Sequence, residues 1–383
     1  MRIGIVTEYY YPTLGGIQEH VYHYALEALA LGHDVKIITS NVYDSPATNA
    51  QGISELPVVR LGRSMPIYNN GSVARLTIGR KLGDRLQEVF DREAFDVIHV
   101  HAPLTPTLPF LALTRSNTVT VGTVHTNFND SVFLRIFRKP MQGHLDRLDG
   151  MIAVSQTAGM ALRPYFDLDF RVIPNGIDVT QFTPDVPRLP EFDDDKINLL
   201  WVARMEPRNG LDRMLGAFAM ASAKRRDLRL LVVGDGPLRT TYEAMVPDAL
   251  RSAVHFLGYV NAGRPALYAT ADVLCTPASI SSFGITLLEG MAAAIPIIAS
   301  DIDGFRDVMV HEREGLFIDT GDTAAFSDAI LKLASDRTLR KALGGRGRET
   351  ALRYSWPHVT RQVLDFYQEL KARRDVKLKC RSE

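Results

Sequence analysis

The chain has 383 residues, 46% of them hydrophobic, and its 44 basic residues balance its 44 acidic ones. This length and composition suit two folded domains and exclude a disordered chain. The balanced charge provides no overall field that attracts nucleic acid, so any anion site must be local.

The number of cysteines and the hydropathy of the chain indicate the cellular compartment in which the protein is expected. Cys275 and Cys380 are the two cysteines, and one of them lies in an apolar run. This usage is typical of a reducing compartment and argues against a disulfide framework. Met1 leads directly into a strand-like run, and no apolar stretch reaches the roughly 18 residues that a membrane-spanning helix needs. We therefore expect a cytoplasmic protein without a signal peptide or a membrane span.

Short apolar runs in the first half of the chain predict β-strands. They cover residues 3–7, 34–39, 58–61, 97–101, 118–125, 150–154 and 170–173. Amphipathic segments separate these runs, and that alternation predicts a parallel sheet covered by helices. We place the first domain at residues 1–180.

A proline-rich segment and a second series of strands follow. Pro184, Pro187, Pro190 and the acidic residues 193–195 predict a linker. Strands are then predicted at 198–203, 228–234, 254–257, 273–276 and 295–300, so the second domain spans 196–355. Helical spacing at 356–375 predicts a helix that packs back across the first domain, followed by a frayed basic tail. The expected fold class is α/β, with two Rossmann-like, doubly wound domains that face a central cleft.

Two loops of the first domain follow strands and carry candidate groups. Gly15 and Gly16 lie between the first strand and a helix, where backbone N–H groups can approach a phosphate or a sugar oxygen. A tight strand-to-helix turn is the alternative. His125 ends a strand, where an imidazole could orient a sugar hydroxyl or stabilise developing positive charge; the alternative is a structural histidine.

Metal and membrane sites are weaker candidates. His99 and His101 alternate along a strand, but no cysteine or carboxylate lies at metal-ligand spacing, so no metal site is predicted. Two segments, 70–85 and 133–139, carry basic residues, which in the second alternate with aromatic and aliphatic ones. Both could dock on anionic lipid, and a solvated helix face is the alternative for each.

The second domain has an arginine and a glycine turn at strand ends. Arg204 follows a strand, and its guanidinium could hold a diphosphate; a surface salt bridge is the alternative. Gly234 lies in the turn after the next strand, which we expect to shape a nucleotide cleft.

A polar turn then opens into a helix at residues 276–291. Free N–H groups at such a helix start can hold a diphosphate, and Glu289, about two turns into the helix, could take ribose hydroxyls. Ordinary helix capping is the alternative.

Taken together, these motifs resemble the retaining GT-B glycosyltransferases of the family-4 type, which use nucleotide sugars. The match covers nearly the whole chain, and the pieces are Gly15-Gly16, His125-Thr126, Pro174-Asn175-Gly176-Ile177-Asp178, Arg204 with Gly210, Gly234-Asp235-Gly236-Pro237, and Ser282-Phe283-Gly284 through Glu289. Within this family the chain looks most like bacterial phosphatidylinositol mannosyltransferases, through Gly15-Gly16-Ile17-Gln18-Glu19-His20, Asn70-Gly71-Ser72-Val73-Ala74-Arg75-Leu76 and Ser300-Asp301-Ile302-Asp303-Gly304-Phe305-Arg306.

The resemblance implies a role for each matching position. The implied donor-binding set is Gly15, Gly16, Arg204, Asn209, Gly234, Val260, Ser282, Phe283, Gly284, Ile285 and Glu289. The implied acceptor-binding set is Tyr10, Gln18, Arg75 and Thr126, and the implied catalytic set is His125, Arg204 and Ser281. The implied reaction transfers a hexose with retention, with mannose from GDP-mannose as the first expectation. It needs no metal or other cofactor. The implied acceptor is phosphatidylinositol or a related anionic lipid, reached by peripheral contact at the inner face of the cell membrane.

The chain departs from the family pattern at two positions. Ser281 stands where the family has a glutamate, and Asn209 stands where it has a lysine. Both changes remove charge from the reaction centre, because serine has no carboxylate and asparagine cannot neutralise a leaving diphosphate. An impaired protein that binds sugar nucleotides is therefore one alternative function. A glycosyltransferase that uses a UDP-sugar and a soluble acceptor is another, and a phosphorylase or an epimerase of the same fold is a third.

Overall fold

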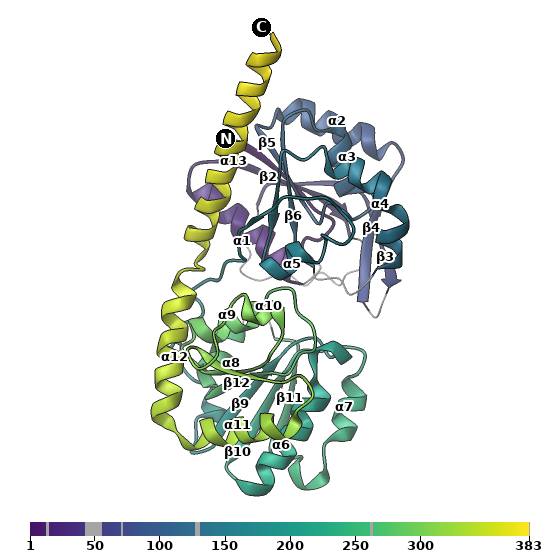
Figure 1. Ribbon diagram of the computed structural model, residues 1–383. Coiled ribbons are helices and arrows are strands. Elements are labelled where there is room, and N and C mark those ends of the chain that lie inside the picture. Colours follow the sequence, from purple (N-terminus) through teal and green to yellow (C-terminus); the bar gives the residue numbers. More distant parts are fainter. Residues whose placement is uncertain (13–14, 43–55, 70–71, 127–130, 261–262, 383) are drawn as a thin grey trace. The chain divides into compact units, whose positions relative to one another are not determined.

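The structure is a computed structural model that describes residues 1–12, 15–42, 56–69, 72–126, 131–260 and 263–382 (Figure 1). It divides into two compact units. The first comprises Met1–Gly176 together with Trp356–Glu383, and the second comprises Ile177–Ser355.

The first unit is built on an eight-stranded sheet with the order β4-β3-β2-β1-β5-β6-β7-β8. Its strands are β1 (Arg2–Val6), β2 (Asp34–Asn41), β3 (Val58–Asn69), β4 (Ser72–Ile78), β5 (Val97–His101), β6 (Val119–Val124), β7 (Gly150–Ala153) and β8 (Arg171–Val172). Its helices are α1 (Gly16–Ala30), α2 (Leu82–Glu93), α3 (Leu108–Arg115), α4 (Val132–Leu145), α5 (Gln156–Met160) and α13 (Trp356–Ser382). All neighbouring strands are parallel except β3 and β4.

Strand β4 is not among the strands predicted from the sequence, where residues 70–85 form a basic segment and a solvated helix face is one reading of it. Arg75 lies instead in β4, which pairs antiparallel with β3. The extended form is stabilised by distant partners, because the N–H of Thr77 donates to Thr107 Oγ1 at 3.0 Å and the hydroxyl of Thr77 donates to the buried carboxylate of Glu8. The helical stretch begins only at α2. Asn70 and Gly71, which open the predicted motif, lie outside the described residues.

The second unit is built on a six-stranded parallel sheet with the order β11-β10-β9-β12-β13-β14. Its strands are β9 (Ile197–Val202), β10 (Leu228–Val233), β11 (Val254–Gly258), β12 (Val273–Thr276), β13 (Ile297–Ser300) and β14 (Gly315–Ile318). Its helices are α6 (Leu211–Lys224), α7 (Arg239–Met245), α8 (Arg264–Thr270), α9 (Ile285–Ala292), α10 (Asp303–Arg306), α11 (Thr323–Ser335) and α12 (Arg337–Leu352). Trp201 on β9 and Phe218 on α6 are almost fully buried in its core.

Both sheets have the strand order of a Rossmann fold, so the doubly wound prediction is confirmed. The order reverses between β1 and β5 in the first sheet and between β9 and β12 in the second. Ligands of such folds bind outside the carboxyl ends of the strands at these points. The loops after β1, β5, β9 and β12 are therefore the places to examine for a site.

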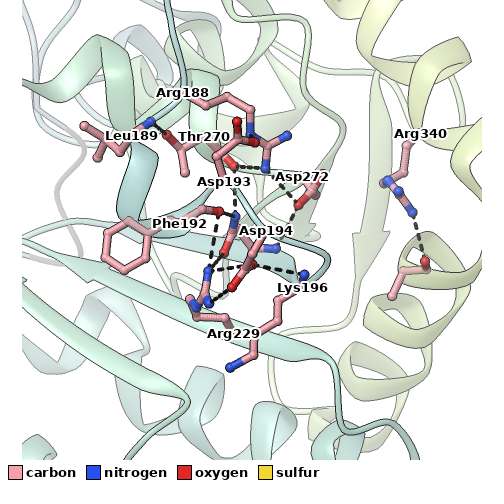
Figure 2. Close-up of polar contacts among 12 residues, drawn as sticks. Arg188, Leu189, Phe192, Asp193, Asp194, Lys196, Arg229, Thr270, Asp272 and Arg340 are labelled. Carbon is pink, nitrogen blue, oxygen red and sulfur yellow. Dashed lines mark hydrogen bonds and ion pairs between the residues drawn. The ribbon is translucent and has the colours of Figure 1, made fainter.

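The segment predicted as a linker belongs to the second unit. Figure 2 shows its polar contacts: Arg229, a buried residue of β10, donates to both carboxylate oxygens of Asp194, and Arg188 donates to the carbonyl oxygen of Thr270 at 2.7 Å. Phe182 and Phe192 are also buried. Asp194, Arg188 and the two buried phenylalanines therefore hold the predicted linker against the second unit.

The last helix packs on the first unit, as predicted, and contacts α1 and β6. Its backbone stays helical to Ser382, so the expectation of a frayed tail is wrong. Contacts just before the predicted end tie the helix to the first unit. Lys371 pairs with Asp96 at 3.1 Å, and Arg374 donates to the carbonyl oxygen of Asn117 at 2.6 Å. Among the described helices, none combines the length and the apolar character that crossing a membrane requires.

Candidate functional site

Two arginines converge on one buried carboxylate at the switch point of the second sheet. Glu206 follows β9, and its side chain is 5% exposed. Its Oε1 lies 3.4 Å from Nε of Arg204, and its Oε2 lies 3.0 Å from Nε of Arg208. The two arginine side chains are 57% and 56% exposed. Within the described part of the chain their Nη atoms have no protein partner, so both guanidinium ends are available to an anion.

Hydrogen bonds join this loop to the loop after β12. The N–H of Ser279 donates to the carbonyl oxygen of Arg208 at 2.8 Å, and Arg213 donates to the carbonyl oxygen of Pro277 at 2.7 Å. Asn209 also has a local role, since its amide donates to the carbonyl oxygen of Arg204 at 2.7 Å. The amide of Asn209 thus shapes the loop that carries the arginines.

The start of α9 has the geometry of an anion site. Gly284 precedes the helix with φ of 120°, a conformation that favours glycine. The N–H groups of Leu287 and Leu288 donate to the carbonyl oxygen of Gly284. This leaves the N–H groups of Ile285 and Thr286 without an acceptor in the helix, at the positive end of its dipole. Phe283 belongs to the implied donor-binding set, but its N–H donates to Ser281 Oγ at 3.4 Å. Ser282 and Ile285 are half-buried at this helix start.

Glu289 lies on α9 and is 2% exposed. Its Oε2 accepts a hydrogen bond from the hydroxyl of Tyr268 at 2.5 Å, and its Oε1 lies 3.2 Å from Nη2 of Arg264. Two residues of α8 thus hold the carboxylate of Glu289 in position. Sequence reasoning missed Arg264 and Tyr268, both on α8, because no motif marks a residue that orients another.

The remaining donor positions of the second unit lie in turns. Gly234 follows β10 with φ of 130°, and a Cβ there would lie 1.9 Å from the carbonyl oxygen of Ala203. Gly234 therefore lets the ends of β9 and β10 approach each other, which places Arg204. Val260 is half-buried after β11, next to two residues outside the described part of the chain.

In the first unit three histidines lie close together: His20 on α1, His101 at the end of β5 and His125 just after β6. His101 Nδ1 lies 2.8 Å from His125 Nε2, and the ring of His20 lies within 5.3 Å of both rings, centroid to centroid. Nδ1 of His20 lies 2.8 Å from Asn175 Oδ1. Burial lowers the pKa of His20 to about 4 and holds the pKa values of His101 and His125 well below their usual range. The imidazole of His125 is therefore neutral at physiological pH.

These three histidines form the one candidate metal group among the described residues. Two imidazole ligands of a tetrahedral zinc ion would be separated by about 3.3 Å, because Zn–N bonds are about 2.0–2.1 Å long. The 2.8 Å separation of His101 and His125 suits a shared proton instead. His99 points elsewhere: its Nδ1 lies 2.6 Å from the hydroxyl of Tyr367. Sequence reasoning missed His20, which is distant in the chain.

The predicted acceptor residues occupy separate elements of the first unit. Gln18 is buried on α1, and Arg75 on β4 donates to Ser64 Oγ at 3.3 Å. Thr126 is exposed after β6. The ring of Tyr10 is 5% exposed and packs in the core, so it offers little surface to an acceptor. Gly15 and Gly16 lie at the start of α1, as predicted.

Comparison with known proteins identifies the family of the chain. Residues 14–181 match the model of the family "Glycosyltransferase Family 4", and residues 184–350 match that of "Glycosyl transferases group 1". The chain is 34% identical over 374 residues to a phosphatidyl-myo-inositol mannosyltransferase of Mycobacterium leprae, with 96% of each chain covered. It is 33% identical to the protein of that name from Mycolicibacterium smegmatis, covering 96% of this chain and 94% of the relative.

Solved structures show the same fold. A sucrose-phosphate synthase of Thermosynechococcus elongatus superimposes with a TM-score of 0.76 at 21% identity, covering 97% of this chain and 99% of that one. A glycosyltransferase of Rickettsia africae does so with a TM-score of 0.76 at 18% identity, covering 96% and 98%. The chain therefore belongs to the GT-B glycosyltransferases of the family-4 type.

Proposed function

We propose that this glycosyltransferase moves mannose from GDP-mannose to a hydroxyl of phosphatidylinositol or a related anionic lipid, with retention at the anomeric carbon. The observation that carries the proposal is the cluster of Arg204, Arg208 and the start of α9 at one switch point of the second sheet. Ion pairs to Glu206 hold the two arginines, a hydrogen bond joins Arg208 to Ser279, and all of these groups favour a diphosphate. The relatives named phosphatidyl-myo-inositol mannosyltransferase support the sugar and the acceptor.

In the proposed reaction the bond from the anomeric carbon to the diphosphate oxygen breaks, and a bond to the acceptor oxygen forms on the same face of the sugar. The proton of the acceptor hydroxyl passes to the leaving diphosphate oxygen, and GDP departs. Negative charge therefore grows on the diphosphate as the bond breaks. Arg204 and the first turn of α9 stabilise that charge, which is the main electrostatic requirement of the step.

Arg208 supplies the second cation in this proposal. The family has a lysine at the position of Asn209, whose amide here donates to the backbone of Arg204. Arg208 donates to the carboxylate of Glu206, which also forms an ion pair with Arg204, and the other end of the Arg208 guanidinium is available to a phosphate. The site therefore keeps two cations although the lysine is absent, and transfer needs no metal ion.

His125 faces the donor sugar in this proposal, as the family resemblance implies. Its neutral imidazole can hydrogen-bond a sugar hydroxyl without repelling the positive charge that develops on the ring. Glu289 takes the ribose hydroxyls, and Arg264 and Tyr268 fix its position.

A nucleotide-sugar-binding protein without turnover is the second candidate, and Ser281 is the observation that favours it. No carboxylate stands at that position. A screen by mass spectrometry separates the two candidates: GDP-mannose and a panel of UDP-sugars are offered with phosphatidylinositol vesicles or soluble inositol. Mannosylated lipid from GDP-mannose supports the proposal, and the anomeric configuration of the product tests retention. Nucleotide binding in a calorimeter without any product favours the second candidate.

A further inference from the structure

The pairing of β5 and β6 holds His101 beside His125. The two strands are parallel, with His101 opposite Thr123, and the N–H of Ala102 donates to the carbonyl oxygen of Thr123 at 2.9 Å. His125 follows Thr123 by two residues. The two imidazoles therefore lie at neighbouring strand ends, where Nδ1 of His101 is 2.8 Å from Nε2 of His125.

A hydrogen bond between two imidazoles needs one proton between the facing nitrogen atoms. Burial holds the pKa values of both histidines well below their usual range, so both rings are neutral and each carries a single N–H. Either His101 donates from Nδ1, or His125 donates from Nε2. Because each ring has only one proton, the direction of this bond also decides whether the outer nitrogen of each ring is protonated.

The outer nitrogen of His101 distinguishes the two directions. His101 is 0% exposed, and its Nε2 has no hydrogen-bond partner among the described residues. If His125 donated, this enclosed Nε2 would carry a proton without an acceptor. If His101 donates, the same nitrogen carries only a lone pair. Among backbone groups, a buried N–H without an acceptor is rarer than an acceptor that lacks a donor, and the same order favours donation by His101.

Donation by His101 determines what His125 can offer to a ligand. Nε2 of His125 is then the acceptor, so the proton of His125 is on Nδ1. Of the side chains in the described part of the protein, His101 alone forms a hydrogen bond with the ring of His125, and Nδ1–H is left to donate to a ligand oxygen. A neutral histidine in water prefers the Nε2–H form, and the partner of one ring nitrogen can reverse that preference.

We propose that His101 is a positioning residue that fixes the Nδ1–H tautomer of His125, so that His125 donates a hydrogen bond to a hydroxyl oxygen of the donor sugar. The inference deepens the proposed function and rests on it, because that function places the sugar at His125. His101 acts through His125 and not on the sugar itself. The buried aspartate of a Ser-His-Asp triad acts in the same way, since it holds an imidazole in one tautomer.

NMR of the full chain, labelled at its histidine nitrogens, tests the tautomer directly at neutral pH. Couplings to the ring C–H protons distinguish a protonated nitrogen from a bare one, and the signals of His125 are those that His125→Gln lacks. We expect Nδ1–H in the wild-type protein. His101→Leu has no donor and should return His125 to Nε2–H. His101→Asn should keep Nδ1–H, because its amide nitrogen can donate from the position of Nδ1. An Nε2–H tautomer in the wild-type protein overturns the inference.

Calorimetric titration with GDP and with GDP-mannose shows whether this contact acts on the sugar. His101→Leu releases both the ring and the proton of His125, so the Kd for GDP-mannose should rise about tenfold, as for one lost hydrogen bond. The Kd for GDP, which has no sugar, should stay the same. His101→Asn should bind both ligands as the wild-type protein does. Equal weakening of GDP and GDP-mannose by His101→Leu, or no weakening of either, overturns the inference.

His99→Gln is the matched control for a change in the buried histidines. His99 lies on the same strand, and its ring centroid is 4.4 Å from that of His101. Its hydrogen bonds go to Tyr367 and Thr123, so its loss disturbs the same core without removing the partner of His125. We expect His99→Gln to keep the Nδ1–H tautomer of His125 and the wild-type Kd for GDP-mannose. The same changes in His99→Gln as in His101→Leu would contradict a specific role of His101.

The outcomes also separate this inference from the proposed function. An Nδ1–H tautomer that depends on His101, in a protein that transfers no mannose, supports the assignment to His101 and contradicts the proposed function. Transfer of mannose by a protein in which His125 carries its proton on Nε2 supports the proposed function and contradicts the inference.

Discussion

The Nε atom of Arg208 lies 3.0 Å from a carboxylate oxygen of Glu206. The other oxygen of that carboxylate is 3.4 Å from Nε of Arg204, so one buried acid orients both arginines. This arrangement uses the Nε side of each guanidinium and leaves the Nη atoms for a ligand. It also explains how a chain with asparagine at position 209 can keep two cations at the proposed diphosphate site.

Replacing Arg208 should slow transfer more than it weakens donor binding. We expect Arg208→Ala to lower kcat about 10²–10³-fold, because the lost charge acts mainly on the departing diphosphate. Steady-state kinetics with GDP-mannose measure the change. Arg251→Ala removes an exposed arginine of the same unit that pairs with Asp248, and it should leave kcat unaltered. Equal kcat values for all three proteins would exclude Arg208 from the site.

Restoring a carboxylate at position 281 should alter catalysis. Ser281 is half-buried, two residues before Phe283, and its hydroxyl accepts from the Phe283 N–H. A glutamate there can bond a sugar hydroxyl more strongly than serine does. We therefore expect Ser281→Glu to change the donor preference or the rate in a mass-spectrometric donor screen. Ser252→Glu adds the same charge at an exposed position and serves as the control. Identical turnover of wild type and Ser281→Glu across the panel removes Ser281 from the site.

Glu289 should contribute to donor affinity. We expect Glu289→Gln to raise the Kd for GDP about 10–100-fold, since hydrogen bonds to a charged group contribute about 1.5–3 kcal/mol. The substitution also leaves Arg264 with a neutral partner, so the melting temperature should fall. Calorimetric titration and thermal unfolding check both effects, with exposed Glu243→Gln as the control. An unchanged Kd for Glu289→Gln contradicts the ribose-binding role.

Acid should destabilise the first unit through its buried histidines. Burial lowers the pKa of His20 to about 4 and that of His99 to about 3. Above the unfolded pKa of about 6.5 both are neutral in either state, so they cause no pH dependence there. Below it the unfolded chain binds protons that the folded chain excludes, and stability falls. Each histidine lowers the free energy of unfolding by about 1.4 kcal/mol per pH unit below 6.5. Together these two therefore lower it by on the order of 4 kcal/mol at pH 5.

Urea unfolding between pH 7 and pH 5 measures this loss. His99→Gln should make the decline shallower than in wild type, whereas the exposed His358→Gln should leave it unchanged. A free energy of unfolding that stays constant from pH 7 to pH 5 would contradict this prediction, because it would show that folding does not lower the pKa values of the buried histidines.

Transfer should not depend on a metal ion. In the proposed reaction Arg204, Arg208 and the start of α9 stabilise the charge of the diphosphate, and the 2.8 Å contact between His101 and His125 suits a hydrogen bond. We expect the same rate in EDTA as in magnesium. Elemental analysis should find less than one zinc ion per chain. Loss of activity in EDTA that magnesium restores would assign the diphosphate charge to a metal instead.

The predictable part of the fold is the part that local patterns determine. Apolar runs alternating with amphipathic segments indicate parallel strands and helices, and the loop after a strand indicates where ligands bind. These rules led to Arg204, Gly284 and Glu289. They could not reveal β4, because its extended form depends on Glu8 and Thr107, which are distant in the chain.

Other features depend on burial, which a sequence does not display. Glu206 looks like an ordinary acidic residue between two arginines until its 5% exposure shows that it orients both. The separation of His20 from His101 and His125 along the chain matches no metal-binding or catalytic motif, yet the fold places the three rings together. The prolines and the acidic residues at 193–195 predict a linker, whereas the buried Arg229 holds Asp194 against the second unit.

The central claim is that the chain transfers mannose through a diphosphate site in its second unit. The most direct measurement is the formation of mannosylated phosphatidylinositol from GDP-mannose by the wild-type protein and by Arg204→Ala. The account predicts a single product with wild type and a rate about 10²–10³-fold lower with the variant. It is contradicted if no nucleotide sugar gives product with a wild-type protein that binds GDP, or if Arg204→Ala transfers mannose at the wild-type rate.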